Sequence, residues 1–460
     1  MGSGGTPGVT DIAAGDGERA AHRVIDQLQA ALGGEVVAIR RQARWRPAWF
    51  VDLRRDGQLQ ELYVRGARTD MRPIFPLEHE RRMQELLGSM GIPVPQVHGY
   101  LRDPPAIVMD RVAGSTEFSG SSDDERRSVM EEYVGILARM HHLDVGPFAD
   151  AGAELPARSS DVARTGIRAY ERAYRVQKLR PDPFMEFCLG WLARNPPRHR
   201  VRPSVVVWDS GQFHHEAGRI SALLDLELAH IGDPMMDLAG LRMRSTVIDY
   251  GPLDALYRRY EDLTGDEVDP AAIAYHHFAF TITPQLAYHR GLVEPTPDSD
   301  LMTYMQWCSE SNLYAVEALA GFVGIELETV DLPDPSPSPA AVAHRHLVDS
   351  LRAMEGSDER SAYQLRTAFR LARHLQRVDE IGATLAERDL DDVAAVIGHR
   401  PANWAESERE LERFVVGADP GSDATLIRLF HRRLERQRAV LGPAGSAMAR
   451  HNPLQPIRPQ

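Results

Sequence analysis

The sequence predicts an α+β protein that carries an additional all-α segment near its C-terminal end. Three observations support this class. Residues 18–113 contain several strand-like runs and one prominent helical pattern, whereas long helical patterns dominate residues 114–328. A run of alternating prolines at Pro333–Pro339 then precedes a further helical stretch, residues 340–442. Because proline-rich segments are stiff and solvated, the prolines are expected to form a linker, and residues 340–442 a helical accessory domain that packs on the preceding part or makes a dimer contact.

Strand-like runs occupy much of the first segment. A helical pattern over residues 18–32 comes first and ends at Gly33-Gly34, a helix-stopping signal. The pattern of apolar residues then predicts strands at residues 35–41, 48–54 and 59–65. The last two flank Asp56-Gly57, which favours a tight hairpin turn. An amphipathic helix over residues 77–90 and two short strands around residues 103–105 complete this part.

Helical patterns dominate the second segment, at residues 123–142, 161–177 and 183–194. Two short β-branched runs, Ser204–Trp208 and Ile220–Leu224, interrupt the helices, and a polar loop separates them. Each run is followed by an aspartate, Asp209 or Asp225. Further helical patterns continue to about residue 321.

The composition is that of a globular protein with mixed surface charge. The formal net charge of −13 arises from interspersed Arg and Asp or Glu, which argues against a nucleic-acid-binding protein, because such proteins carry a basic surface. No apolar run approaches the roughly 20 residues of a membrane span, so no membrane partner is expected. Cys188 and Cys308 lie far apart and lack metal-ligand spacing, so the cytoplasm is the expected compartment.

Three further segments are expected to lack regular structure: residues 1–17 as a disordered leader, residues 329–339 as a linker and residues 443–460 as a disordered tail. Lys178 is the single lysine of the chain. Any basic side chain that contacts a phosphate from the residues before Lys178 must therefore be an arginine.

Asp209 and Asp225 are the residues that first indicate a chemistry. Phosphoryl transfer needs one carboxylate to orient the attacking hydroxyl and another to hold the magnesium ion that bridges the phosphates. Two carboxylates at strand ends meet this requirement. They are equally compatible with ordinary turn and cap residues, so the spacing alone leaves both interpretations open.

A longer motif follows the second strand. Asp225-Leu226-Glu227 and Gly232-Asp233-Pro234, continued by Asp237-Leu238-Ala239, resemble the signature of the aminoglycoside phosphotransferase family, in a branch near the acyl-CoA-dehydrogenase-linked phosphotransferases. The resemblance implies a bilobal protein-kinase-like fold, with an N-lobe at residues 18–113 and a mainly helical C-lobe at residues 114–328. It implies that Asp209 is the catalytic base and Asp225 a metal ligand. Asp233 and Asp237 are expected to cap a helix instead.

The resemblance extends to the predicted third strand and the helix after it. Arg65 would hold the α- and β-phosphates of ATP and pair with Glu80, although Glu78 on the same helix competes for that role. Backbone groups from Met109 to Val112 would contact the adenine edge.

Three departures from the family pattern bear on activity. Trp208 replaces a glycine before the catalytic aspartate, where its bulk could reshape the site. The second metal ligand is not an asparagine: His214 holds the corresponding position, and Gln212 is favoured because an amide oxygen suits magnesium better than an imidazole.

The third departure is the loop expected to cover the phosphates, residues 42–49, which lacks glycines. Arg44 and Arg46 could contact phosphate in place of backbone amides, or Trp45 and Pro47 could close the pocket.

Together these residues predict a phosphotransferase that uses ATP and Mg²⁺. It would transfer the γ-phosphate to a hydroxyl of a small molecule, with a hydroxyacyl-CoA favoured over an aminoglycoside-like compound. The alternative is a degenerate pseudokinase that serves as a binding or regulatory module. A homodimer through the C-terminal helical domain is also expected.

Overall fold

The computed structural model describes residues 16–42, 46–68, 71–297, 299–336, 338–442 and 452–457. The chain forms two compact units that interleave in sequence. The first unit combines the residues up to Glu154 with Ser204–Ile231, and the second combines Leu155–Pro203 with the residues from Gly232 onward. The boundaries of these units differ from the expected boundaries of the two lobes. The division into an N-lobe and a C-lobe therefore stays a prediction.

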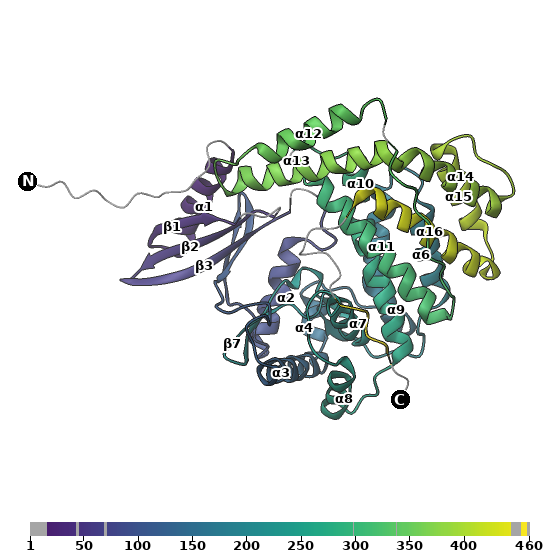
Figure 1. Ribbon diagram of the computed structural model, residues 1–460. Coiled ribbons are helices and arrows are strands. Elements are labelled where there is room, and N and C mark those ends of the chain that lie inside the picture. The colour runs from purple at the N-terminus through teal and green to yellow at the C-terminus, as the bar shows by residue number, and fades with distance from the viewer. Residues whose placement is uncertain are drawn as a thin grey trace, which may run out of the picture. The chain divides into compact units, whose positions relative to one another are not determined.

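The first unit contains a five-stranded antiparallel sheet in the order β1-β2-β3-β5-β4 (Figure 1). The strands are β1 (Glu35–Arg41), β2 (Ala48–Arg55), β3 (Gln58–Gly66), β4 (Val97–Arg102) and β5 (Pro105–Asp110). Helix α1 (Asp16–Leu32) packs Val24 and Leu28 against the apolar side chains of this sheet. The hairpin turn at Asp56 and Gly57 has φ of 53° and 78°, the left-handed pair that a tight turn requires.

The other elements of the first unit are α2 (Leu77–Ser89), α3 (Asp123–His141), α4 (Gly146–Asp150), β6 (Ser204–Val206), β7 (Phe213–Glu216), β8 (Arg219–Leu223) and β9 (His230–Gly232), of which β9 ends at the boundary between the units. Ser122 begins α3 with a capping box: it accepts the backbone N–H of Glu125, whose carboxylate accepts the N–H of Ser122. Strand β7 lies in the segment expected to be a polar loop, so that expectation was incomplete.

The second unit is helical. Its helices are α5 (Thr165–Gln177), α6 (Pro183–Arg194), α7 (Met235–Arg244), α8 (Leu253–Thr264), α9 (Pro270–Thr281), α10 (Thr283–Val293), α11 (Leu301–Val323), α12 (Ala341–Ala353), α13 (Glu359–Arg377), α14 (Ala383–Ile397), α15 (Trp404–Gly417) and α16 (Asp423–Leu441). Helix α15 packs on α6 and α16 packs on α11, so the C-terminal helices share one core with the earlier ones. The architecture confirms the α+β class, with extra C-terminal helices.

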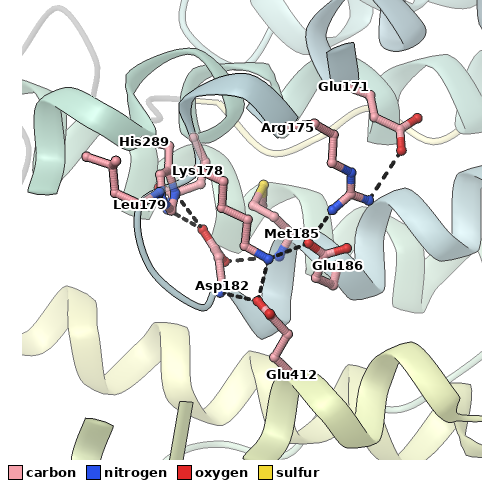
Figure 2. Close-up of polar contacts among 10 residues, drawn as sticks. Glu171, Arg175, Lys178, Leu179, Asp182, Met185, Glu186, His289 and Glu412 are labelled. Atoms are coloured by element: carbon pink, nitrogen blue, oxygen red, sulfur yellow. Dashed lines mark hydrogen bonds and ion pairs between the residues drawn. The ribbon is translucent and has the colours of Figure 1, made fainter. Parts of the chain in front are cut away.

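The single lysine lies where α15 meets the segment between α5 and α6 (Figure 2). Lys178 Nζ lies 2.6 Å from carboxylate oxygens of both Glu186 and Glu412. Glu412, from α15, also accepts the backbone N–H of Asp182 at 2.6 Å. This lysine therefore fastens a C-terminal helix rather than contacting a phosphate. Among the described residues, no helix combines the length and apolar character that a membrane crossing needs.

Candidate active site

The loop after β6 presents Asp209. Trp208 has φ of 58°, and the N–H of Asp209 donates to the carbonyl of Val207 at 2.7 Å, so the chain turns sharply here. The Trp208 ring is fully buried and meets His230 edge-on, with ring centroids 5.5 Å apart. Asp209 itself is half-buried. The bulky residue at the family's glycine position thus packs in the interior of the unit.

Helix α3 fixes the same loop from its other end. The hydroxyl of Tyr133 lies 2.7 Å from Ser210 Oγ and accepts the N–H of Gly211 at 2.6 Å. Tyr133 is itself buried. Because these contacts hold the residues directly after Asp209, they restrict where its carboxylate can point.

Gln212 links Asp209 to Asp225. Its Nε2 donates to Asp209 Oδ2 at 2.7 Å, and its backbone carbonyl accepts the N–H of Leu224 at 2.9 Å. Asp225 follows Leu224 directly and has φ of 57° and ψ of 59°. The three predicted site residues therefore lie on adjoining segments at the end of the β7–β8 hairpin. Their oxygen-bearing side chains are of the kind that magnesium prefers.

His214, the other candidate for the second metal position, has a different contact. Its Nδ1 donates to the carbonyl of Val112 at 3.0 Å. Val112 follows β5, whereas Met109 is buried within β5 and its sulfur lies 3.7 Å from Gln84 Nε2. His214 thus holds the segment expected to contact adenine, and Gln212 remains the candidate beside Asp209.

Arg65 lies at the centre of a buried ion-pair cluster. Its Nε lies 2.8 Å from Glu80 Oε1, and its Nη2 contacts Asp225 Oδ1. The side chains of Arg65 and Glu80 are only 7% and 4% exposed. Burial alone would lower the pKa of Arg65, but the charges of Asp225 and Glu80 outweigh it and raise that pKa above its usual value. Burial raises the pKa of Glu80, while the positive charge of Arg65 opposes the rise.

Of the two glutamates on α2, Glu80 contacts Arg65 and Glu78 contacts another arginine. Glu78 contacts Arg81 at 2.6 Å, and this hydrogen bond lowers the pKa of Glu78 despite a smaller opposing effect of burial. Helix α2 also places His79, whose Nε2 donates to the carbonyl of Ala229 at 2.7 Å. One helix thus positions the partner of Arg65 and steadies the segment after Asp225.

Glu227 is a site residue whose contacts the sequence did not reveal. Arg46 Nη2 contacts its Oε2, Arg65 Nη2 lies 3.8 Å from that oxygen, and Arg68 Nη1 lies 4.0 Å from Oε1. The side chains of Arg46 and Arg68 are almost fully buried. Three guanidinium groups therefore surround one carboxylate two residues after Asp225. The predicted phosphate contact Arg44 and the neighbouring Trp45 lie outside the described residues.

Asp233, in the second unit, has the structural role expected of it. Its Oδ1 accepts the N–H of Met235 at 3.2 Å at the start of α7 and lies 3.0 Å from Arg200 Nη2. Its Oδ2 lies 3.1 Å from His276 Nε2. Burial opposes ionisation, but His276 and Arg200 together lower the pKa of Asp233 to about 2. Asp237, in the first turn of α7, is fully buried.

Comparison with known proteins yields one family and several relatives. The phosphotransferase enzyme family matches residues 46–274. Acyl-CoA dehydrogenase family member 11 of Homo sapiens is 27% identical over 176 residues, which are 35% of this chain and 22% of that protein. Acyl-CoA dehydrogenase family member 10 of Mus musculus is 26% identical over 176 residues, or 16% of its length. The match thus spans about a fifth of these relatives, and it confirms the predicted relation to acyl-CoA-dehydrogenase-linked proteins.

A solved structure shows the same fold. A candidate aminoglycoside phosphotransferase from Ralstonia eutropha JMP134 superimposes with a TM-score of 0.51 at 16% identity, covering 66% of this chain and 98% of its own. The predicted kinase-like fold is therefore confirmed.

Proposed function

Residues 46–274 of the chain belong to the phosphotransferase enzyme family, and from this premise we propose that the protein is an ATP-dependent phosphotransferase acting on a hydroxyl of a small molecule. One observation supports the proposal most strongly. Asp225 contacts Arg65, which is buried and lies 2.8 Å from Glu80. A basic residue that binds phosphates in a kinase-like site is expected to pair with a helix glutamate in this way.

Each side chain of the site would have a distinct task. Asp209 would orient the acceptor hydroxyl and receive its proton. Asp225 and Gln212 would hold Mg²⁺, because both offer hard oxygen ligands on adjoining segments. Bound magnesium would neutralise charge that develops on the phosphates. Arg65, kept in place by Glu80, would contact the α- and β-phosphates.

Arginines would replace the missing glycine-rich loop. Arg46 and Arg68 lie on either side of the β2–β3 hairpin and both reach Glu227. Guanidinium groups bind phosphate oxygens with paired hydrogen bonds. ATP phosphates would therefore take over contacts that these arginines make with Glu227, and Arg44 would add a further one. Adenine would contact the backbone from Met109 to Val112.

The acceptor is proposed to be a hydroxyacyl-CoA rather than an aminoglycoside-like compound. This preference rests on the similarity to the two acyl-CoA dehydrogenase family members. A cytoplasmic location also remains a proposal. It is supported by Cys188 and Cys308, which are free, buried thiols whose pKa values are raised, chiefly by burial.

The decisive measurement is calorimetric titration of the protein with ATP, with and without magnesium. We expect magnesium-dependent binding in the wild type and at least about tenfold weaker binding in Asp225→Asn. Asparagine tolerates the left-handed backbone of Asp225, so the change removes charge without adding strain.

Asp56→Asn is the matched control, because Asp56 also has a positive φ but lies in the exposed β2–β3 turn. Its ATP affinity should equal that of the wild type. If the wild type binds neither ATP nor GTP at millimolar concentration, the proposal fails.

The second candidate is a pseudokinase that binds nucleotide without turnover. The observation that favours it is the engagement of Arg46 and Arg68 by Glu227, since a firmly held cluster would keep these arginines from the phosphates. Phosphate release or transfer measured on the same preparations distinguishes the two. ATP binding without phosphoryl transfer to any hydroxyl acceptor in a screen would favour the pseudokinase.

A further inference from the structure

A His-Glu-Glu cluster lies between two helices of the second unit. Glu317 comes from α11, and His431 and Glu435 lie one turn apart on α16. One potential ligand atom from each of the three side chains lies within 4.8 Å of the other two. One imidazole and two carboxylates form a donor set that suits zinc and similar first-row divalent ions.

The cluster is part of a regular antiparallel helix seam. Near one end of the seam, Gln306 Nε2 donates to the carbonyl of Leu441 at 3.3 Å. Glu310 then pairs with Arg438 at 3.4 Å. Glu317 follows Glu310 by two helical turns, and His431 precedes Arg438 by the same interval, so the register of the helices brings the two together. Helix packing, rather than chance meeting of long side chains, therefore positions the cluster.

His431 is buried and faces a carboxylate of the cluster. Its side chain is only 9% exposed, and its Nε2 lies 3.9 Å from Glu435 Oε1. That distance is too long for a hydrogen bond between the two side chains. An ion that binds nitrogen and oxygen at about 2.0–2.2 Å would bridge a gap of this size.

The charges of the cluster also favour a cation. Two half-buried carboxylates, Glu317 and Glu435, approach the same imidazole. Arg438 contacts the second oxygen of Glu435 at 3.8 Å, which leaves Oε1 directed at His431. Because the two carboxylates carry charge of the same sign, a divalent cation between them would stabilise the arrangement.

We infer that Glu317, His431 and Glu435 form a binding site for a first-row divalent metal ion such as Zn²⁺. The ion fastens α16 of the accessory domain to α11. Three protein ligands leave one coordination position for water. This site is independent of the proposed phosphotransferase reaction, and its test requires no substrate or nucleotide.

The test is titration of the chelator-treated full-length protein with ZnCl₂ alone, followed by calorimetry and by the melting temperature. We expect one equivalent of tightly bound Zn²⁺ and a rise in Tm. The affinity for Zn²⁺ should fall at least about tenfold in His431→Gln and in Glu435→Gln, since each change removes a ligand. The rise in Tm on addition of zinc should become smaller in both variants. Glu435 is 26% exposed, so its variant should fold even if the change at His431 does not.

Two controls make the outcome specific. His399→Gln changes an exposed histidine that contacts Glu410 at 2.9 Å and should keep the zinc site. Asp225→Asn should keep it as well, because its carboxylate belongs to the proposed magnesium site. Absence of one-equivalent binding, or binding that survives His431→Gln, would overturn the inference. A Tm that does not respond to zinc would also overturn it.

Discussion

Two single residues of the candidate site have a backbone that side chains usually avoid. Trp208 and Asp225 have φ of 58° and 57°, in the left-handed region. This conformation costs about 1–2 kcal/mol for a residue other than glycine, and such strain gathers at functional sites. Full burial of the Trp208 ring offsets part of the cost. The loss of a glycine before Asp209 therefore need not displace that aspartate.

Asp233 makes a contribution to stability that depends on pH. Its pKa of about 2 in the folded protein lies below the value of about 3.9 for an unfolded chain. The stabilisation is therefore complete above the unfolded pKa and is lost as the pH falls from about 5 towards 2. Asp233→Asn should lower the free energy of unfolding by on the order of 2 kcal/mol at pH 7 and by much less near pH 2.

Denaturant unfolding at a series of pH values measures this difference. Asp262→Asn serves as the control, because Asp262 is an exposed aspartate of the same unit. Its unfolding curve should follow that of the wild type at every pH. If Asp233→Asn lowered the free energy of unfolding equally at pH 7 and pH 2, the charge of the carboxylate would not be the source of its stabilising effect.

The sequence predicted some site residues better than others, for a physical reason. The motif at Asp225 and the strand position of Arg65 indicated two residues that the structure joins by an ion pair. The same motif contained Glu227 but did not reveal its arginine partners, because Arg46 lies 181 residues away in the chain. A pattern along the chain specifies residue types, whereas side-chain pairing across such separations depends on the folded backbone.

At the scale of elements, one short segment joins several helices of the second unit. Lys178 follows α5, contacts Glu186 of α6 and reaches Glu412 of α15 (Figure 2). His289 of α10 accepts the N–H of Leu179 at 3.2 Å and lies 3.4 Å from Asp182 Oδ2. Burial opposes ionisation of Glu186, but Arg175 and Lys178 outweigh it and lower its pKa. The segment is therefore held by charge from several sides.

Replacement of the single lysine should loosen α15. Lys178→Met leaves Glu412 without its cation in a partly buried position, so we expect a loss on the order of 2 kcal/mol in unfolding free energy. Hydrogen exchange should rise in α15 more than in the sheet of the first unit. The double variant Lys178→Met/Glu412→Leu should recover part of the loss, because it removes both charges.

The control for this prediction is Arg290→Met. Arg290 pairs with Glu294 on the surface of α10, and both side chains are more than half exposed, so the change should cost at most about 0.5 kcal/mol. If Lys178→Met costs no more than this control and leaves exchange in α15 unchanged, the lysine does not fasten that helix.

Elements were predicted correctly where the segment with a regular apolar pattern was long. They were missed where the segment was short. The first three strands and the helix at residues 77–90 appear within one or two residues of their expected bounds. Strand β7 was missed because Phe213–Glu216 is short and contains two adjacent histidines. Its strand conformation depends on pairing with β8, with Phe213 opposite Leu223. Such pairing depends on tertiary structure, so the sequence of a short polar segment does not predict it.

At the scale of the whole molecule, the order of the segments was easier to predict than their grouping. The linear pattern yields contiguous segments, whereas the compact units interleave residues from distant parts of the chain. Leu155–Pro203 groups with the later helices because α5 packs on α10 and α6 packs on α15. These contacts join faces of helices whose separate patterns look alike, so sequence periodicity does not identify the partners.

The expected homodimer also concerns the whole molecule. Exposed apolar side chains in and next to α12 support it. Val342 and Met354 are 71% and 55% exposed, and Leu347 is 44% exposed. Apolar side chains of α12 and α13, among them Leu351, Leu365 and Phe369, also line a groove. Exposed apolar surface of this kind is typical of protein interfaces. We therefore expect a dimer at micromolar concentration in sedimentation experiments.

Val342→Glu should weaken that dimer at least about tenfold, because it places a charge in the apolar interface. Val176→Glu is the matched control: Val176 is also a valine of the second unit, 75% exposed, but it lies on α5. The control protein should sediment as the wild type does. A monomeric wild type would contradict the proposed dimer, and a dimer unaffected by Val342→Glu would assign its interface to another surface. A dimer lost in both variants would point to general destabilisation, which their melting temperatures would reveal.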